Sequence, residues 1–176
     1  MAIREEESRK KDVRWMPGGL AAFFREIAEV YSAEKLTFLC IGTDRSTGDA
    51  LGPLTGSRLL EYGFPNVTGT LPSPCDADNL VQRITEIPEG QIIIAIDACL
   101  GPPAALGCYF AAAQPLRPAE SVGLRLPAVG NYSLAAIVDV NSPRPYRTLQ
   151  TTPLYRVILM ADQIALAAAH GFGLTD

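Results

Sequence analysis

Two kinds of apolar segment alternate along this chain, and their alternation predicts the class of the fold. Residues 36–41 and 91–97 are short, nearly continuous apolar runs, as expected of parallel strands that are buried on both faces. Residues 17–35, 50–64 and 153–173 carry apolar side chains at helical spacing instead. Strands that alternate with helices favour a three-layer α/β/α domain, in which helices cover both faces of a mostly parallel sheet.

The segments between these elements have weaker patterns. A long loop is expected over 115–131, because prolines and glycines interrupt that stretch. We expect further strands and helices in five places: strands at 66–71, 107–114 and 146–152, and helices at 75–87 and 133–140.

The composition excludes several classes of protein. The chain of 176 residues suits one domain, which we expect over 15–176 after a charged lead-in at 1–14. Its formal net charge of −4 gives no electrostatic reason to expect a nucleic acid or an anionic membrane as partner. No apolar run approaches the ~20 residues that span a bilayer, and no signal peptide is visible, so we expect a cytoplasmic protein. The four cysteines form no CxxC pair, which argues against a zinc-ribbon site.

The segment "GTDRSTGDALGP" at 42–53 looks like a phosphate-binding loop, but its spacing is wrong for one. Gly42 and Gly48 enclose five residues where a Walker A loop has four, and Asp49 follows in place of the lysine. A dinucleotide-binding fingerprint needs glycine at position 44, which is an aspartate here. Because carboxylates repel phosphate, the loop does not favour nucleotide binding.

Two aspartates accompany the two clearest strands. Asp49 comes after the strand at 36–41, and Asp97 ends the strand at 91–97. If these strands are neighbours, both carboxylates lie at the sheet edge where parallel α/β proteins bind ligands. Such a pair can share a proton, with one carboxylate activating water while the other acts as an acid, or it can bind a divalent metal. Each also has a structural interpretation, Asp49 as a helix N-cap and Asp97 as a buried carboxylate that needs partners.

Three blocks of the sequence resemble a known family. "CIGTDRSTGDALGPLTGSRL", "IIIAIDACLG" and "LRLPAVGNYSLAAIVDV" resemble, in this order within residues 36–170, the YyaC-type sporulation proteins of endospore-forming bacteria. That family is similar to the hydrogenase-maturation endopeptidases and to the germination protease that degrades small acid-soluble spore proteins, so the resemblance implies their α/β fold. In the germination protease, a "DALGP" block and an "AIDA" block carry the two essential aspartates. Both blocks are intact here, so the resemblance implies that Asp49 and Asp97 hydrolyse a peptide bond of a spore protein.

The sequence departs from the hydrogenase-maturation endopeptidases at one point. Those enzymes recognise nickel with acidic residues at the positions of Asp49 and Asp97 and with a histidine in a later loop. The corresponding loop here, roughly 128–134, has no histidine, and His170 lies near the end of the last predicted helix. We therefore expect no metal and no other cofactor. Two alternatives stay open: a metal-dependent endopeptidase in which Asn131 supplies an oxygen, and a non-catalytic binding or regulatory protein of sporulation.

Four residues near the aspartates are candidates for binding the peptide substrate. Arg45 can pair with an acidic group of the substrate or with Asp44, and the Ser46 hydroxyl can orient a carboxylate. Gly130 and Asn131 can form a backbone wall against a peptide carbonyl. Their simpler interpretations are turn chemistry and a solvated surface arginine.

Overall fold

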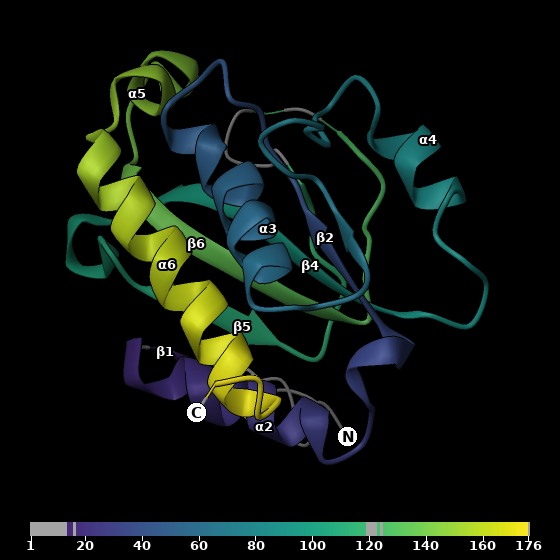
Figure 1. The fold of residues 1–176 in the computed structure, drawn as a ribbon. Helices are drawn as coiled ribbons and strands as arrows, with labels where there is room; N and C mark the ends of the chain where they lie inside the picture. Colours follow the sequence, from purple (N-terminus) through teal and green to yellow (C-terminus); the bar gives the residue numbers. More distant parts are fainter. Residues whose placement is uncertain (1–13, 16, 119–122, 124, 176) are drawn as a thin grey trace, which may run out of the picture.

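The computed structural model describes residues 14–15, 17–118, 123 and 125–175 of the chain. Its centre is a six-stranded sheet of order β1-β5-β6-β4-β2-β3 (Figure 1). Strands β3, β2, β4 and β6 are parallel to one another, whereas β5 pairs antiparallel with both β6 and β1. The predicted α/β fold with a mostly parallel sheet is thus confirmed. The strands are β1 (Arg14–Trp15), β2 (Leu36–Cys40), β3 (Val67–Thr68), β4 (Ile92–Gly101), β5 (Tyr109–Ala112) and β6 (Tyr132–Val140).

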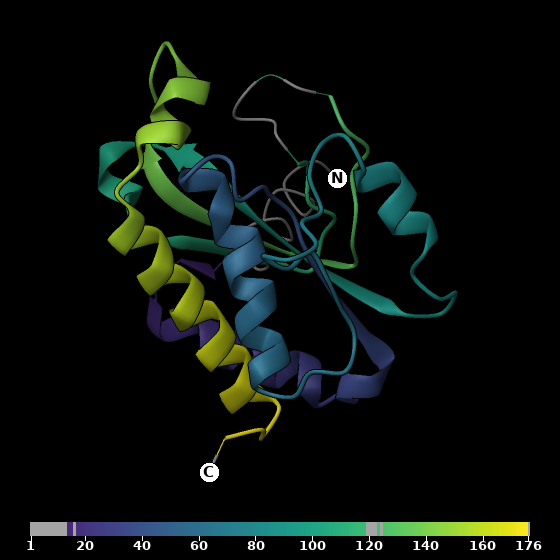
Figure 2. The ribbon, with the colours of Figure 1, turned by 45° about the horizontal axis from the view of Figure 1, so that its top comes forward.

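Helices lie on both faces of this sheet. Helices α2, α3 and α6 cover one face together, and α4 lies on the opposite face (Figures 1 and 2). The α-helices are α2 (Leu20–Ala28), α3 (Leu51–Glu61), α4 (Leu80–Thr85), α5 (Pro145–Thr151) and α6 (Leu154–Gly171). Four 3-10 turns complete the described elements: η1 (Pro17–Gly19), η2 (Ala33–Lys35), η3 (Gly48–Ala50) and η4 (Pro103–Ala105).

The central strands are apolar on both faces because each face packs against its own hydrophobic cluster. Phe38 of β2 and Ile96 of β4 belong to the cluster formed with α2, α3 and α6. Their chain neighbours Leu39 and Ala95 point the other way and pack with Leu80 of α4. Side chains alternate along a strand, so a strand between two helical layers has no polar face. This is the physical reason for the continuous apolar runs seen in the sequence.

Two elements differ from the prediction. Residues 133–140, predicted as a helix, belong to β6, which pairs with β4 on one side and β5 on the other. Residues 146–152, predicted as a strand, lie mostly in α5. Pro145 begins that helix, and the hydroxyl of Thr151 donates a hydrogen bond to the carbonyl oxygen four residues earlier. Threonine is common in strands, but here its hydroxyl bonds to the helix backbone instead.

The bounds of other elements also changed. Strand β4 continues past Asp97 to Gly101, so Asp97 lies within the strand and does not end it. Of the predicted lead-in at 1–14, residues 1–13 lie outside the described residues, while Arg14 is in β1 and pairs with Ala111. In the described part of the chain, no helix combines the length and the apolar character needed to cross a membrane.

Candidate functional site

Strand β4 projects beyond its neighbour β2, and Asp97 lies where the overhang begins. The last register pair of the two strands is Cys40 with Ile96, and the backbone N–H of Ile41 donates to the carbonyl oxygen of Ile96 at 2.8 Å. Asp97 is therefore flanked by β6, where it pairs with Ala135, but not by β2. One side of the residue faces the space above the end of β2.

The chain that leaves β2 folds back so that Asp49 lies above the end of that strand. The backbone N–H of Thr43 donates to the carbonyl oxygen of Asp49 at 3.2 Å. A Cβ atom on Gly42 would collide with the same carbonyl oxygen, so only glycine allows this close approach. The N-cap of α3 is Ala50, and no side chain caps either η3 or α3. The interpretation of Asp49 as an N-cap is therefore wrong.

Both aspartates line one cavity of about 170 Å³ at the carboxyl edge of the sheet. Its walls come from both layers, because Tyr146 and Leu149 belong to α5 whereas Asp76 and Asp78 precede α4. A water molecule occupies roughly 30 Å³ in the liquid, so the cavity holds a few waters or one side chain. The lining residues are Ile41, Gly42, Thr43, Arg45, Asp49, Asp76, Ala77, Asp78, Asp97, Ala98, Leu126, Tyr146 and Leu149.

Burial perturbs the acid strength of one of the two carboxyl groups. Desolvation raises the pKa of Asp49, because a charged carboxylate is less stable away from water. The hydroxyl of Ser46 is buried and has no hydrogen-bond partner of good geometry among the described residues, although its proximity to Asp49 opposes the rise in the pKa of that carboxyl group. The net direction is upward, which favours a protonated Asp49.

We expect Asp49→Asn to raise the melting temperature more at about pH 7 than at about pH 3. The pKa of Asp49 is higher in the folded than in the unfolded protein, so folding favours the protonated form. Stability from this group is present at low pH and is lost as the pH rises through the folded pKa. Asparagine does not ionise and avoids that loss. Thermal unfolding at both pH values, with the exposed Asp44→Asn as control, measures the effect; equal differences at the two pH values would contradict it.

Arg45, predicted to bind the substrate, lines the same cavity, and its ion-pair partner is Asp76 and not Asp44. Its guanidinium group pairs with Asp76 at 3.4 Å, and its Nε donates to the hydroxyl of Thr43 at 3.3 Å. The side chain is 73% exposed, so this ion pair is solvated and weak. Arg45 is therefore free to exchange Asp76 for another acidic group without a large energetic cost.

The structure does not bring Gly130 and Asn131 to this cavity. The backbone N–H of Asn131 donates to the carbonyl oxygen of Ile93 at 2.8 Å, and its side-chain oxygen accepts the N–H of Ile93 at 2.8 Å. Both residues precede β6, whereas Asp97 pairs with Ala135 further along that strand. Asn131 lies four residues before Ala135, which corresponds to roughly 13 Å along the strand at ~3.3 Å per residue. The prediction that Gly130 and Asn131 form a backbone wall beside the aspartates is therefore corrected. These residues lie where β4 and β6 begin, at the other end of the two strands from the cavity.

Four polar residues of the cavity were not among the predicted site residues: Thr43, Asp76, Asp78 and Tyr146. Asp76 and Asp78 lie within the segment 75–87 that was predicted as a helix, but α4 begins only at Leu80. Tyr146, which is 53% exposed, was placed on a strand that is in fact α5. The acidic pair within "CDADN" was the only sequence signal for this wall, and it was ambiguous because acidic residues also favour helix N-termini.

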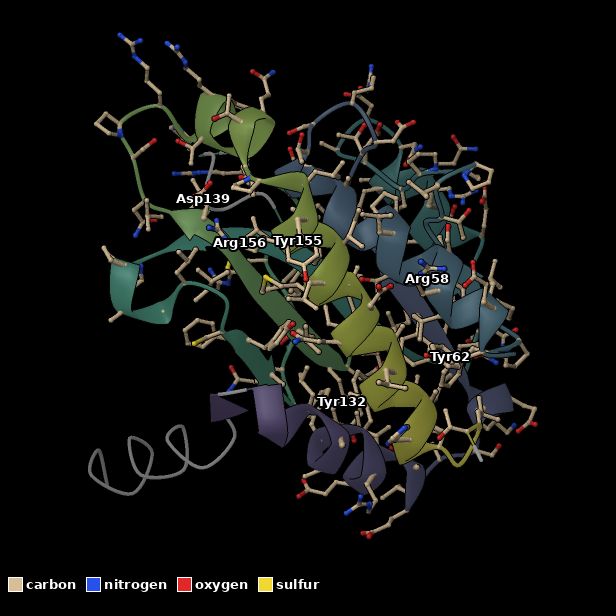
Figure 3. All side chains as sticks on the ribbon, turned by 60° about the vertical axis from the view of Figure 1, so that its left-hand side comes forward. Arg58, Tyr62, Tyr132, Asp139, Tyr155 and Arg156 are labelled. Atoms are coloured by element: carbon tan, nitrogen blue, oxygen red, sulfur yellow. The ribbon has the colours of Figure 1, made fainter. Side chains whose placement is uncertain are left out.

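A polar cluster behind η3 supports the turn that carries Asp49. Asp139 and Arg156 lie together where β6 ends and α6 begins (Figure 3). The hydroxyl of the buried Thr152 donates to Oδ2 of Asp139 at 3.0 Å, and Arg156 donates to the carbonyl oxygen of Val138 at 3.0 Å. A Cβ atom on Gly48 would lie only 3.1 Å from Oγ1 of Thr152. The junction of α5 and α6 therefore packs directly against the residue before Asp49.

Thr152→Val should lower the free energy of unfolding by about 1–2 kcal/mol, because it removes a buried hydrogen bond and leaves Asp139 with fewer donors. The shape of the side chain is nearly unchanged, so lost packing does not explain the effect. Thr151→Val is the matched control, since the Thr151 side chain is exposed and bonds only to backbone carbonyls of its own helix. Chemical denaturation measures both variants, and an equal loss in both would contradict the role of Thr152.

Comparison with known proteins identifies relatives of this chain. The family described as "Protein of unknown function (DUF1256)" matches residues 16–167. The "Uncharacterized protein YyaC" of Bacillus subtilis (strain 168) is 38% identical over 150 residues, which cover 82% of this chain and 71% of that protein. The resemblance to the YyaC-type family is thereby confirmed.

A solved structure shows the same fold. The crystal structure of the [NiFe] hydrogenase maturation protease HycI from Thermococcus kodakarensis KOD1 superimposes with a TM-score of 0.56 and 16% sequence identity. The match covers 84% of this chain and 98% of that chain. At this level of identity the comparison concerns the fold, and it confirms the fold that the sequence resemblance implied.

The donor set at the cavity does not fit nickel. Nickel favours imidazole and thiolate ligands, whereas the side chains that line this cavity offer carboxylates, which suit hard cations better. Among the described residues, no group of three or more His, Cys, Asp and Glu side chains is arranged to hold a metal ion. The amide of Asn131, considered as an oxygen donor, is bonded to Ile93 at the other end of the strands.

We expect the purified protein to carry less than stoichiometric nickel and zinc, because the cavity presents carboxylates without a histidine or a cysteine pair. Elemental analysis after purification without chelators measures the content. Asp97→Asn provides the control for specific retention. A stoichiometric transition metal that is lost in this variant would contradict the prediction.

Proposed function

Because the chain belongs to the family described as "Protein of unknown function (DUF1256)" and has the fold of a hydrogenase maturation protease, we propose that it hydrolyses a peptide bond with Asp49 and Asp97. The observation that supports this proposal most is the shared cavity, into which two elements far apart in sequence each bring one carboxyl group. The raised pKa of Asp49 adds to it, since two carboxyl groups divide acid and base roles when their environments differ.

The proposed reaction consumes one water and restores both carboxyl groups. Asp97, ionised, accepts a proton from the water while the water oxygen bonds to the carbonyl carbon of the peptide. Asp49 acts in its protonated form, which burial favours by raising its pKa, and donates its proton to the carbonyl oxygen. The resulting diol then collapses: the C–N bond breaks, Asp97 returns its proton to the leaving nitrogen, and Asp49 takes a proton from one hydroxyl.

We further propose that the substrate is a spore protein. The support is the sequence resemblance: the "DALGP" and "AIDA" blocks that contain Asp49 and Asp97 match those of the protease that degrades small acid-soluble spore proteins. The test is incubation of the purified protein with an extract of such proteins, followed by mass spectrometry of the fragments. Cleavage at a defined peptide bond is expected, and intact substrates together with no hydrolysis of a general peptide library would refute the proposal.

A second candidate function is binding without hydrolysis. The donor set supports it, because the cavity lacks the histidine implied by the resemblance to the hydrogenase-maturation endopeptidases, as expected of a protein that retained the fold for another use. The discriminating observation is a peptide that binds with one-to-one stoichiometry and is recovered intact after prolonged incubation. Arg45 and Asp76 form a solvent-exposed ion pair that a charged group of the peptide can replace, and in this case they would serve recognition alone.

A further inference from the structure

A second cavity adjoins Asp97. It measures about 480 Å³ and is larger than the cavity of about 170 Å³ that Asp49 also lines. Asp97 and Ala98 belong to the walls of both cavities. Asp97, which the proposed mechanism uses as base, therefore borders both spaces.

The second cavity lies on the same face of the sheet as α4, because its lining residues Leu116 and Ala135 belong to the hydrophobic cluster that contains Leu80. Its floor includes Cys99 of β4 together with Ser133 and Ala135 of β6, and it extends to Asn141 after that strand. The segment 115–117 forms another wall. Ser133 lies near the start of β6 and Asn141 follows its last residue, so the cavity is elongated along the direction of that strand. The shape thus fits an extended polypeptide better than a compact ligand.

The two cavities carry opposite charges beside the shared Asp97. The first is lined by the carboxylates of Asp76 and Asp78 and by Asp49, whose neutral form burial favours, against the guanidinium group of Arg45, which already pairs with Asp76. The second has one further charged lining residue, Arg117, whose side chain is exposed. A ligand with a positive group on one side of Asp97 and a negative group on the other matches this arrangement.

We propose that the two cavities are the halves of one binding site for an extended peptide with a basic side chain on the Asp49 side and an acidic side chain on the Arg117 side. The proposal rests on the proposed function only in placing the scissile bond at Asp97. The basic side chain fits the smaller cavity, where Asp78 is exposed and available to it. Backbone groups of the peptide fit the longer cavity, where Ser133 and Asn141 offer polar side chains. Charge at the two ends then selects the substrate and sets its direction.

Peptide binding to the intact wild-type protein tests this inference. The probes are fluorescent peptides of about nine residues with a non-hydrolysable hydroxyethylene group in the centre, long enough to reach both cavities. One set carries lysine before the centre and glutamate after it, a second set has the reverse order, and glutamine replaces either or both charges. We expect one of the two orders to bind at least about tenfold more tightly than the uncharged peptide, and to weaken with added salt.

Variants then assign each charge to its cavity. Asp78→Asn should remove the benefit of lysine alone, and Arg117→Gln should remove the benefit of glutamate alone. Arg125→Gln, another exposed arginine of the same connection, is the control that changes neither. Equal affinity for all peptides, no binding at all, or a uniform loss in both variants would overturn the inference. Charge-dependent binding without hydrolysis of a cleavable peptide would support this inference and refute the proposed function. Hydrolysis without a charge preference would support the proposed function and refute this inference.

Discussion

Asp49→Asn and Asp97→Asn should each lower the rate of peptide hydrolysis by at least about a hundredfold and leave the free energy of unfolding unchanged or higher. An amide keeps the size of the carboxyl group but neither accepts nor returns the proton in the proposed reaction. In Asp97→Asn, the side-chain oxygen still accepts the hydrogen bond that Asp97 receives from the backbone N–H of Ala98 at 2.9 Å. In Asp49→Asn, the cost of burying a charge is removed, because desolvation is the main cause of the raised pKa of Asp49.

The paired measurement of rate and stability separates a catalytic from a structural role. Asp44→Asn is the matched control, since Asp44 is exposed in the same loop and does not line the cavity. It should change neither the rate nor the melting temperature. If Asp49 and Asp97 serve only as structural acceptors, both amide variants should lose stability by roughly 0.5–2 kcal/mol. Loss of stability in both, with no hydrolysis by the wild-type protein, would refute the catalytic pair.

Gly52→Ala should lower the free energy of unfolding by at least about 3 kcal/mol, because the added methyl group would overlap backbone atoms. Gly52 is the glycine of the "DALGP" block and lies in the first turn of α3. A Cβ atom there would collide with the carbonyl oxygen of Ile41 and lie 2.6 Å from its carbonyl carbon. Both obstacles are backbone atoms, so relief requires α3 to move away from the end of β2.

The displacement predicted for Gly52→Ala also bears on the site. Asp49 lies three residues before Gly52, so a shift of α3 moves the carboxyl group away from Asp97 and should abolish hydrolysis in the protein that remains folded. Gly19→Ala is the control, because nothing lies within 4 Å of its added Cβ and its φ of −85° suits alanine. Chemical denaturation of both variants checks the prediction. A stability of Gly52→Ala within about 1 kcal/mol of the wild type would contradict the close packing of α3 on β2.

Strand β6 and helix α5 show where sequence patterns failed. Residues 134–138 form a short apolar run, and such a run fits a buried helix as well as a buried strand. The choice came from pairing: β6 fills the position between β4 and β5 and bonds to both. The threonines of 146–152 favoured a strand, yet this segment packs against η3 as a helix, where Leu149 lies against Gly48.

The candidate site was predictable in part, for a related reason. Asp49 follows a strand that its apolar run predicts to be buried, and Asp97 lies in another such strand. Predicting both residues at the carboxyl edge of the sheet therefore needed only the assumption that the two strands are neighbours. Asp76 and Tyr146 reach the cavity through the packing of two further segments, which no local pattern encodes. The position of Gly130 was predicted wrongly because it depends on the register of β6 against β4. That register is set by pairing along the whole strand, and it places Gly130 at the other end of the sheet from the aspartates.

The sequence by itself determined the elements whose physical cause is local. Continuous apolar runs produce buried strands, amphipathic periods produce α2 and α6, and Gly42 and Gly52 permit the close turn that carries Asp49. Only the tertiary structure decided which carboxylates share a cavity, how acidic Asp49 is, and that a second cavity begins at Asp97. These properties depend on distances between segments far apart in the chain and on how much water their packing excludes. Neither the distances nor the exclusion of water follows from the identity of neighbouring residues alone.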